Sequence, residues 1–161
     1  MVIVGYQGIG KSTLAANKDN NFIDLESGNF WVDGKRDEKW YVPYCSIAAS
    51  LSEQGFNVFV SSHEVVRKEL AKYNVPKLVI CPSHNLKEQW IKKLKDRYEA
   101  SGLDKDYKAW KNAEDRYDEN IDEIINSEGF FVDLIMEMDY NLYDIIWASH
   151  HNIMALMEED E

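Results

Sequence analysis

The first twelve residues constrain the fold more than any other part of the chain. The apolar run VIV (residues 2–4) has the β-branched composition of a short buried strand, and GYQGIGKS (residues 5–12) follows it directly. The glycines allow a compact loop whose backbone N–H groups converge, because no Cβ obstructs a ligand's approach. A helix is predicted over residues 11–17, and its positive end would face the same point. This arrangement predicts a site for phosphate.

GYQGIGKS matches the pattern G-x-x-x-x-G-K-[ST], which is the P-loop of nucleotide-binding proteins. The alternative is a glycine-rich turn that only resembles the motif, but the strand before it and the helix after it favour the P-loop. Lys11 would bind the β- and γ-phosphates, Ser12 would offer its hydroxyl to Mg²⁺, and Thr13 would lie near the α-phosphate. The predicted nucleotide-binding residues of the loop are Gly8, Ile9, Gly10, Lys11, Ser12 and Thr13.

Strand and helix patterns alternate along the rest of the chain. Strands are predicted at residues 2–5, 21–25, 56–60, 77–81 and 130–136, with helical patterns between and after them. Repeated βα units with right-handed crossovers give a parallel sheet covered by helices. We therefore expect an α/β fold, a three-layer α/β/α sandwich with a five-stranded parallel sheet. Its functional edge would lie at the carboxyl ends of the strands.

Local patterns also predict helix boundaries and one buried helix face. Pairs of a Ser or Asn with an acid three residues later predict helix starts at Ser61–Glu64, Asn85–Glu88 and Asn141–Asp144. The helix after Ser61 is expected to run to about residue 73. In the helix predicted over residues 40–51, spacings of three and four place these residues on one apolar face: Trp40, Tyr44, Ile47, Ala48 and Leu51.

Composition limits the function classes. The chain has 161 residues, enough for one domain with a real core, and a formal net charge of −11. Such an acidic balance disfavours sequence-independent binding of nucleic acid, while a small anion can still bind to local cations and backbone N–H groups. Cys45 and Cys81 are not in a CxxC spacing, as expected for reduced thiols in a cytoplasmic protein. No apolar run approaches a membrane span, and because the first strand is predicted to start at Val2, we expect no signal peptide before it.

With its P-loop and five βα units in order, the chain resembles the small P-loop kinases. These include the nucleoside monophosphate kinases, with shikimate and gluconate kinases as relatives, and kinase-like proteins encoded by phages. The resemblance implies one kinase domain over residues 1–161, with an acceptor-binding segment at about 27–54 and a short lid at about 83–104. It also implies ATP and Mg²⁺ as cofactors and a nucleoside monophosphate as the small-molecule acceptor.

The resemblance assigns acceptor contacts to residues after the second and third strands. Asp24 and Ser27 fall where these kinases bind the acceptor, and Tyr41 belongs to an aromatic-rich segment suited to a nucleobase. Arg67 would bind the acceptor's phosphate through its planar fork. The alternatives are a polar strand end for Asp24 and a solvated surface arginine for Arg67.

Two further segments depart from the family pattern. The third strand ends in Ser61-Ser62, where many nucleoside monophosphate kinases have a Mg²⁺-holding Asp. This departure leaves open which acid replaces that Asp, and Asp24 is a candidate for the role. Residues 93–97, KLKDR, stand in place of the lid sequence Arg-[Ile/Leu]-x-x-Arg. The resemblance then implies that Arg97 contacts the transferring phosphoryl group and that Lys93 lies beside the adenine. The alternative is that both belong to an ordinary basic helix face. Arg116 is a weaker candidate on the next helix.

The sequence thus favours an ATP-dependent nucleoside monophosphate kinase whose catalytic residues are Lys11, Arg97 and Asp24. One alternative is a kinase for a non-nucleotide hydroxyl, like the shikimate or gluconate kinases, which the altered third-strand end favours. Another is a nucleotide-binding sensor that hydrolyses little, favoured by the missing acid on that strand and by a total of only four arginines.

Overall fold

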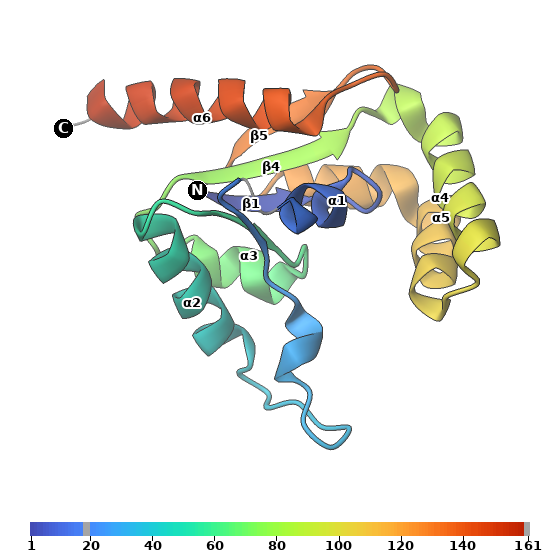
Figure 1. Cartoon of the computed structure of the whole chain (residues 1–161), viewed down its shortest axis with the longest axis horizontal. Coiled ribbons are helices and arrows are strands. Elements are labelled where there is room, and N and C mark those ends of the chain that lie inside the picture. The colour runs from blue at the N-terminus through green and yellow to red at the C-terminus, as the bar shows by residue number, and fades with distance from the viewer. Residues whose placement is uncertain (18–19, 160–161) are drawn as a thin grey trace.

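The computed structural model describes residues 1–17 and 20–159. Five strands form one sheet, and every neighbouring pair in it is parallel (Figure 1). The strands are β1 (Val2–Gly5), β2 (Phe22–Asp24), β3 (Asn57–Val60), β4 (Lys77–Pro82) and β5 (Phe131–Ile135). Their order across the sheet is β2-β3-β1-β4-β5. The expected α/β class with a five-stranded parallel sheet is confirmed.

Helices cover the two faces of this sheet. They are α1 (Lys11–Ala16), α2 (Tyr41–Glu53), α3 (Glu64–Leu70), α4 (Lys87–Ser101), α5 (Asp104–Ile125) and α6 (Leu142–Glu159), with short 3-10 helices at Ser27–Phe30 and His84–Leu86. Figure 1 shows α6 above the sheet, with α2 and α3 below it. Helices α4 and α5 pack against each other as a hairpin whose connection is Gly102-Leu103 (Figure 1).

The three central strands form the middle of the core. Residues 2–4 of β1, 58–60 of β3 and 78–81 of β4 are all buried. Continuous β-branched and apolar runs of this kind are typical of parallel strands that helices cover on both faces. In the middle of the sheet, Ile3 of β1 lies opposite Phe59 of β3 and Leu78 of β4.

The sheet reverses its direction of winding beside β1. From β1 the chain passes to β2 at one edge, and from β3, the neighbour of β1, it crosses to β4 on the other side. Loops that leave two adjacent strands in opposite directions open a crevice at the carboxyl ends of those strands, where open α/β sheets bind ligands. The fold therefore positions the loop after β1 at the edge predicted to be functional.

The buried face of α2 differs from the predicted one. Its buried residues are Tyr44, Cys45, Ala48, Ala49 and Ser52, while the side chain of Ile47 is 43% exposed. This face lies against α3 and β3, and its small side chains allow close approach. The prediction for Ile47 was wrong because the buried face of α2 is rotated toward the smaller side chains, which pack more closely than isoleucine would.

Two of the three predicted helix starts are also wrong. Helix α3 begins at Glu64 with His63 as its N-cap, and the hydroxyl of Ser61 hydrogen-bonds Nδ1 of His63 instead of a helical N–H. It ends at Leu70, before the expected boundary. Asn85 lies inside a 3-10 turn, so α4 begins only at Lys87.

The third predicted start is confirmed. The N–H of Asp144 donates to Oδ1 of Asn141 at 3.0 Å, and α6 begins at the intervening Leu142. Among the residues that the structure describes, no helix combines the length and the apolar character needed to cross a membrane.

Candidate functional site

The glycine-rich loop adopts a backbone path that its glycines make possible. Gly8 has φ +86° and Gly10 has φ +108°, in the left-handed region that L side chains rarely enter. A Cβ on Gly8 would also lie 3.0 Å from Cδ2 of Leu94 in α4. The loop therefore turns tightly from β1 into α1 and passes close beside α4.

A cleft of about 750 Å³ opens beyond the carboxyl ends of β1, β2 and β3, beside α4 and α5. The predicted site residues that line it are Gly8, Gly10, Lys11, Ser12, Thr13, Asp24, Ser27, Lys93 and Arg97. They come from three separate segments of the chain, residues 8–13, 24–27 and 93–97, and the fold brings these segments to one place.

Three predicted residues do not line the cleft. The side chain of Ile9 is buried in the core, so only its backbone belongs to the loop surface. Tyr41 is half-buried at the start of α2, where its ring lies edge-on to Trp40 with centroids 6.3 Å apart.

Arg67 is the third predicted residue that does not line the cleft. It joins α3 to the end of α5 through hydrogen bonds. Its Nε donates to the carbonyl of Ser62 at 2.9 Å, and its Nη1 donates to the carbonyl of Glu123 at 3.1 Å and the hydroxyl of Ser127 at 3.0 Å. It borders a different hollow, of about 530 Å³. Arg116, the weaker candidate, pairs with Glu119 and Glu123 on the exposed face of α5 instead of reaching inward.

The ionisation states of Lys11 and Asp24 depend on each other. The ammonium of Lys11 donates to the carbonyl of Gly5 at 2.9 Å, and burial lowers its pKa while Asp24 and Glu26 oppose that change. Burial, reinforced by Glu26, raises the pKa of Asp24, and Lys11 and Lys105 oppose that rise. Removing charges from water disfavours ionisation, and the opposite charges across the cleft partly restore it.

The α4–α5 hairpin contributes two residues that the sequence did not single out. Nε of Arg97 lies 3.0 Å from Oδ1 of Asp106, whose side chain is only 4% exposed. Lys105, the residue before Asp106, also lines the cleft. In sequence, both belong to a run of charges that is ordinarily a solvated helix face. The turn at Gly102 directs the first turn of α5 back toward the cleft.

Tyr44 fixes the spacing between the ends of β2 and β3. Its hydroxyl donates to the carbonyl of Leu25 at 2.6 Å and accepts from the N–H of Ser61 at 2.8 Å. The interpretation of Tyr44 as a core residue is confirmed, since it is fully buried. The hydrogen bonds add a role that helical spacing does not predict: they hold the segment of Asp24 beside that of Ser61.

The cleft offers hard oxygen donors that suit Mg²⁺ bound to phosphate. Within residues 1–17 and 20–159, no group of three or more His, Cys, Asp or Glu side chains forms a metal cage. Mg²⁺ in nucleotide sites keeps several waters and uses substrate phosphates with one or two protein oxygens, so it does not need such a cage. The exposed hydroxyl of Ser12 and the carboxylates of Asp24 and Glu26 line the same cleft and fit that requirement.

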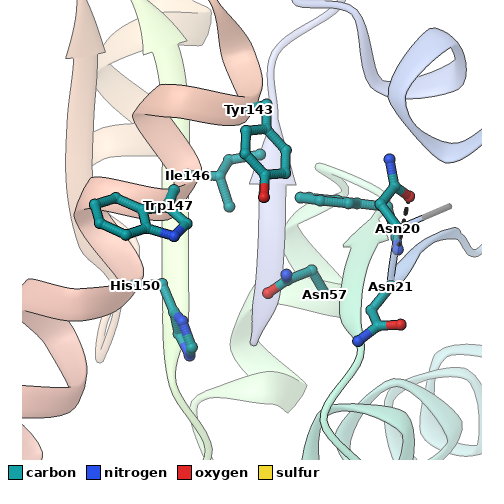
Figure 2. A pocket seen from close by; sticks show the side chains of 8 residues that line it. Asn20, Asn21, Asn57, Tyr143, Ile146, Trp147 and His150 are labelled. Atoms are coloured by element: carbon teal, nitrogen blue, oxygen red, sulfur yellow. Dashed lines mark hydrogen bonds between the residues drawn. The ribbon is translucent and has the colours of Figure 1, made fainter. Parts of the chain in front are cut away.

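A smaller hollow of about 250 Å³ lies at the opposite edge of the sheet, near the amino ends of β2 and β3. Figure 2 shows Tyr143, Trp147 and His150 of α6 near Asn21 and Asn57. None of the predicted site residues lines this hollow. The cleft at the carboxyl ends is therefore the candidate functional site.

Comparison with known proteins does not assign a function to this cleft. No protein-family model matches the chain, and no curated protein is significantly similar to it in sequence. A functional proposal therefore depends on the fold and on the chemistry of the cleft.

Proposed function

We propose that this protein is an ATP-dependent phosphotransferase. The observation that supports the proposal most strongly is the common cleft of Lys11, Ser12, Asp24 and Arg97 at the point where the sheet reverses its winding. Phosphoryl transfer requires groups that bind phosphates, hold a metal ion and neutralise charge. The cleft combines a phosphate-binding motif, a serine hydroxyl suited to Mg²⁺, a carboxylate and a cation from the α4–α5 hairpin.

The donor nucleotide would bind along the loop. The N–H groups of residues 8–13 and the ammonium of Lys11 would hold the phosphates of ATP, with the N-terminal end of α1 adding its positive potential. The hydroxyl of Ser12 would hold Mg²⁺, with Asp24 contacting it through water. When bound, Mg²⁺ would neutralise charge on the β- and γ-phosphates.

The hairpin would supply the charge that stabilises the transferring group. Arg97 and Lys105 line the same cleft as the segment of Asp24. An acceptor oxygen attacks the γ-phosphorus while the bond from that phosphorus to the bridging oxygen breaks, and ADP leaves. Where the acceptor is a hydroxyl group, its proton passes to solvent. Negative charge spreads over the equatorial oxygens during this step, so fixed cations lower the barrier without a strong general base.

A nucleoside monophosphate is the first candidate acceptor. It would enter between the segment of Ser27 and the ends of β2 and β3, beside the aromatic residues of the proposed acceptor segment 27–54. Phe30, Trp40 and Tyr44 form one aromatic cluster in that segment, with Trp40 and Tyr44 centroids 5.4 Å apart. Trp40 and Tyr44 are buried, so of the three only the half-buried Phe30 would offer a face to a base. A monophosphate needs a cation as well as a stacking surface.

A non-nucleotide hydroxyl compound is the second candidate acceptor, and the position of Arg67 favours it. Because Arg67 is hydrogen-bonded between α3 and α5, the predicted cation for an acceptor phosphate does not line the cleft. The acceptor side instead presents the hydroxyls of Ser27 and Ser61 and the carboxylates of Asp24 and Glu26. Carboxylates and hydroxyls bind the hydroxyl groups of a sugar or hydroxy acid well.

An ADP-release assay with Mg·ATP tests the proposal. The panel contains ribo- and deoxyribonucleoside monophosphates together with sugars and hydroxy acids, and Lys11→Ala is the blank. Stimulation by one or two compounds, absent from Lys11→Ala, would establish the phosphotransferase and identify its acceptor class. ATP binding without stimulation by any compound would contradict the proposal and favour a nucleotide sensor.

A further inference from the structure

Two aromatic side chains hold the glycine-rich loop from outside the cleft. The indole Nε1 of Trp90 in α4 donates to the carbonyl of Gln7 at 2.8 Å. The hydroxyl of Tyr140, just before α6, donates to the carbonyl of Ile9 at 2.8 Å. The two rings stack on each other, with centroids 6.0 Å apart and planes 22° apart. One stacked pair thus fixes two alternate peptide units of the loop.

The fixed carbonyls determine where two N–H groups point. A trans peptide is planar, so its N–H points opposite to its C=O. The carbonyl of Gln7 shares a peptide unit with the N–H of Gly8, and the carbonyl of Ile9 shares one with the N–H of Gly10. Holding both carbonyls toward Trp90 and Tyr140 therefore orients the N–H groups of Gly8 and Gly10 away from the aromatic pair.

Lys93 fixes the direction of the hydrogen bonds in this cluster. Its ammonium lies 4.3 Å from the centroid of the Trp90 ring and donates to the hydroxyl of Tyr140 at 3.1 Å. An ammonium has only donors, so the Tyr140 oxygen accepts from Lys93 and its proton goes to Ile9. Burial raises the pKa of Tyr140 to about 12, so the hydroxyl keeps that proton at neutral pH.

We propose that Trp90 and Tyr140 are positioning residues that preorganise the loop for a phosphate ligand. The inference rests on the proposed function, since it concerns how the same loop binds phosphate. It also links the loop to α4, the helix of Arg97, so that the phosphate-binding N–H groups and the hairpin cation keep one relative position. A preorganised anion site does not have to reorient its dipoles when the ligand binds.

Tyr140→Phe and Trp90→Phe remove the two donors. Binding of Mg·tripolyphosphate, measured by titration calorimetry, should weaken about three- to tenfold in each variant, as expected for one lost hydrogen bond. In ¹⁵N spectra, Tyr140→Phe should shift the Gly10 amide most, and Trp90→Phe the Gly8 amide. A general loss of stability would not select one amide in this way.

Two matched variants serve as controls. Tyr117→Phe also removes a hydroxyl that donates to a backbone carbonyl, that of Ser83 at 2.8 Å, but this bond does not involve the loop. Trp110→Phe removes a buried indole N–H that has no hydrogen-bond partner among the described residues. Both should keep the wild-type affinity for tripolyphosphate, even where thermal unfolding shows a loss of stability.

The outcomes separate this inference from the proposed function. If Lys11→Ala binds tripolyphosphate much more weakly than wild type, but Tyr140→Phe binds it as wild type does, the positioning role is wrong and the phosphate site stands. If wild type itself does not bind, or Lys11→Ala binds equally well, both proposals fail. If Trp90→Phe does not fold, the nearly isosteric Tyr140→Phe still tests the inference. Its affinity for tripolyphosphate and the chemical shift of its Gly10 amide are then the two measurements that decide.

Discussion

Nε of Arg97 lies 3.0 Å from the buried carboxylate of Asp106, across the turn that joins α4 to α5. The second oxygen of that carboxylate accepts from the hydroxyl of Ser101 at 2.5 Å. The end of α4 and the first turn of α5 therefore share one carboxylate. This arrangement holds the guanidinium of Arg97 at the rim of the cleft. The ion pair with Asp106 uses Nε and does not use the two Nη groups.

Replacing Asp106 by Asn should slow phosphoryl transfer more than it weakens ATP binding. The amide keeps the size of the side chain but removes the charge that orients Arg97, and a charge-assisted hydrogen bond of this kind corresponds to about a tenfold change in rate. The measurement is kcat with the acceptor identified by ADP release. Asp104→Asn is the control, because Asp104 pairs with Lys108 on the surface of the same helix turn. Equal rates for the two variants would contradict the role given to Asp106.

Lys105→Met should lower kcat by about tenfold if the ammonium of Lys105 stabilises the transferring phosphoryl group. Methionine is unbranched like lysine, keeps most of the length of the side chain and has a similar helix propensity, so the fold should be preserved. Lys108→Met makes the same change one turn later on α5, where the lysine side chain is 75% exposed, and it should leave the rate unchanged. A normal rate in Lys105→Met would remove this residue from the mechanism.

His84 should make the stability depend on pH. Its Nδ1 lies 2.7 Å from Asp118 and its Nε2 lies 2.8 Å from Asp122, and these carboxylates raise its pKa. Lys87, the other charged group here, pairs with Asp118 at 3.1 Å. Only imidazolium can donate from both nitrogens, so the contribution of His84 is complete below its unfolded pKa and is lost as pH rises through its higher folded pKa.

The variant His84→Gln should therefore lose more unfolding free energy, relative to wild type, at about pH 6 than at about pH 8.5. Denaturant unfolding of both proteins at the two pH values measures this difference. A difference between the proteins that stays constant, or that grows with rising pH, would show that the two contacts do not require the protonated imidazole.

Cys45 and Cys81 should resist thiol reagents in the native protein. Both are buried, and burial raises the pKa of each thiol to about 12. Because the thiolate is the reactive form, labelling at about pH 8 should follow unfolding and speed up with denaturant. Rapid labelling of the native protein would show that one of the thiols is accessible as thiolate.

The sequence predicted the elements whose signals are local. The strand before Gly5, the helix from Lys11 and the cap of Asn141 on Asp144 each depend on neighbouring residues, and each is confirmed. The start of α3 was missed because Ser61, with a hydroxyl able to cap a helix, bonds to His63 instead. Local patterns thus identify which element follows another, and less reliably the residue at which it begins.

The rest of the candidate site depends on contacts between distant parts of the chain. Tyr140 reaches Ile9 across 131 positions, and Trp90 reaches Gln7 across 83. In sequence, Trp90 is simply one member of an apolar helix face, and nothing there reveals which carbonyl its N–H will meet. Arg67 is the converse case: a suitable residue at a suitable place in sequence is held by Ser127 instead.

Binding of Mg·ATP tests the central claim most directly. Titration calorimetry would compare wild type with Lys11→Ala and with Lys68→Ala, a control lysine that pairs with Glu64 on the surface of α3. We expect wild type and Lys68→Ala to bind with equal affinity, and Lys11→Ala to bind at least about tenfold more weakly with its fold intact. Absence of ATP binding in wild type, or equal binding by Lys11→Ala, would contradict the central claim.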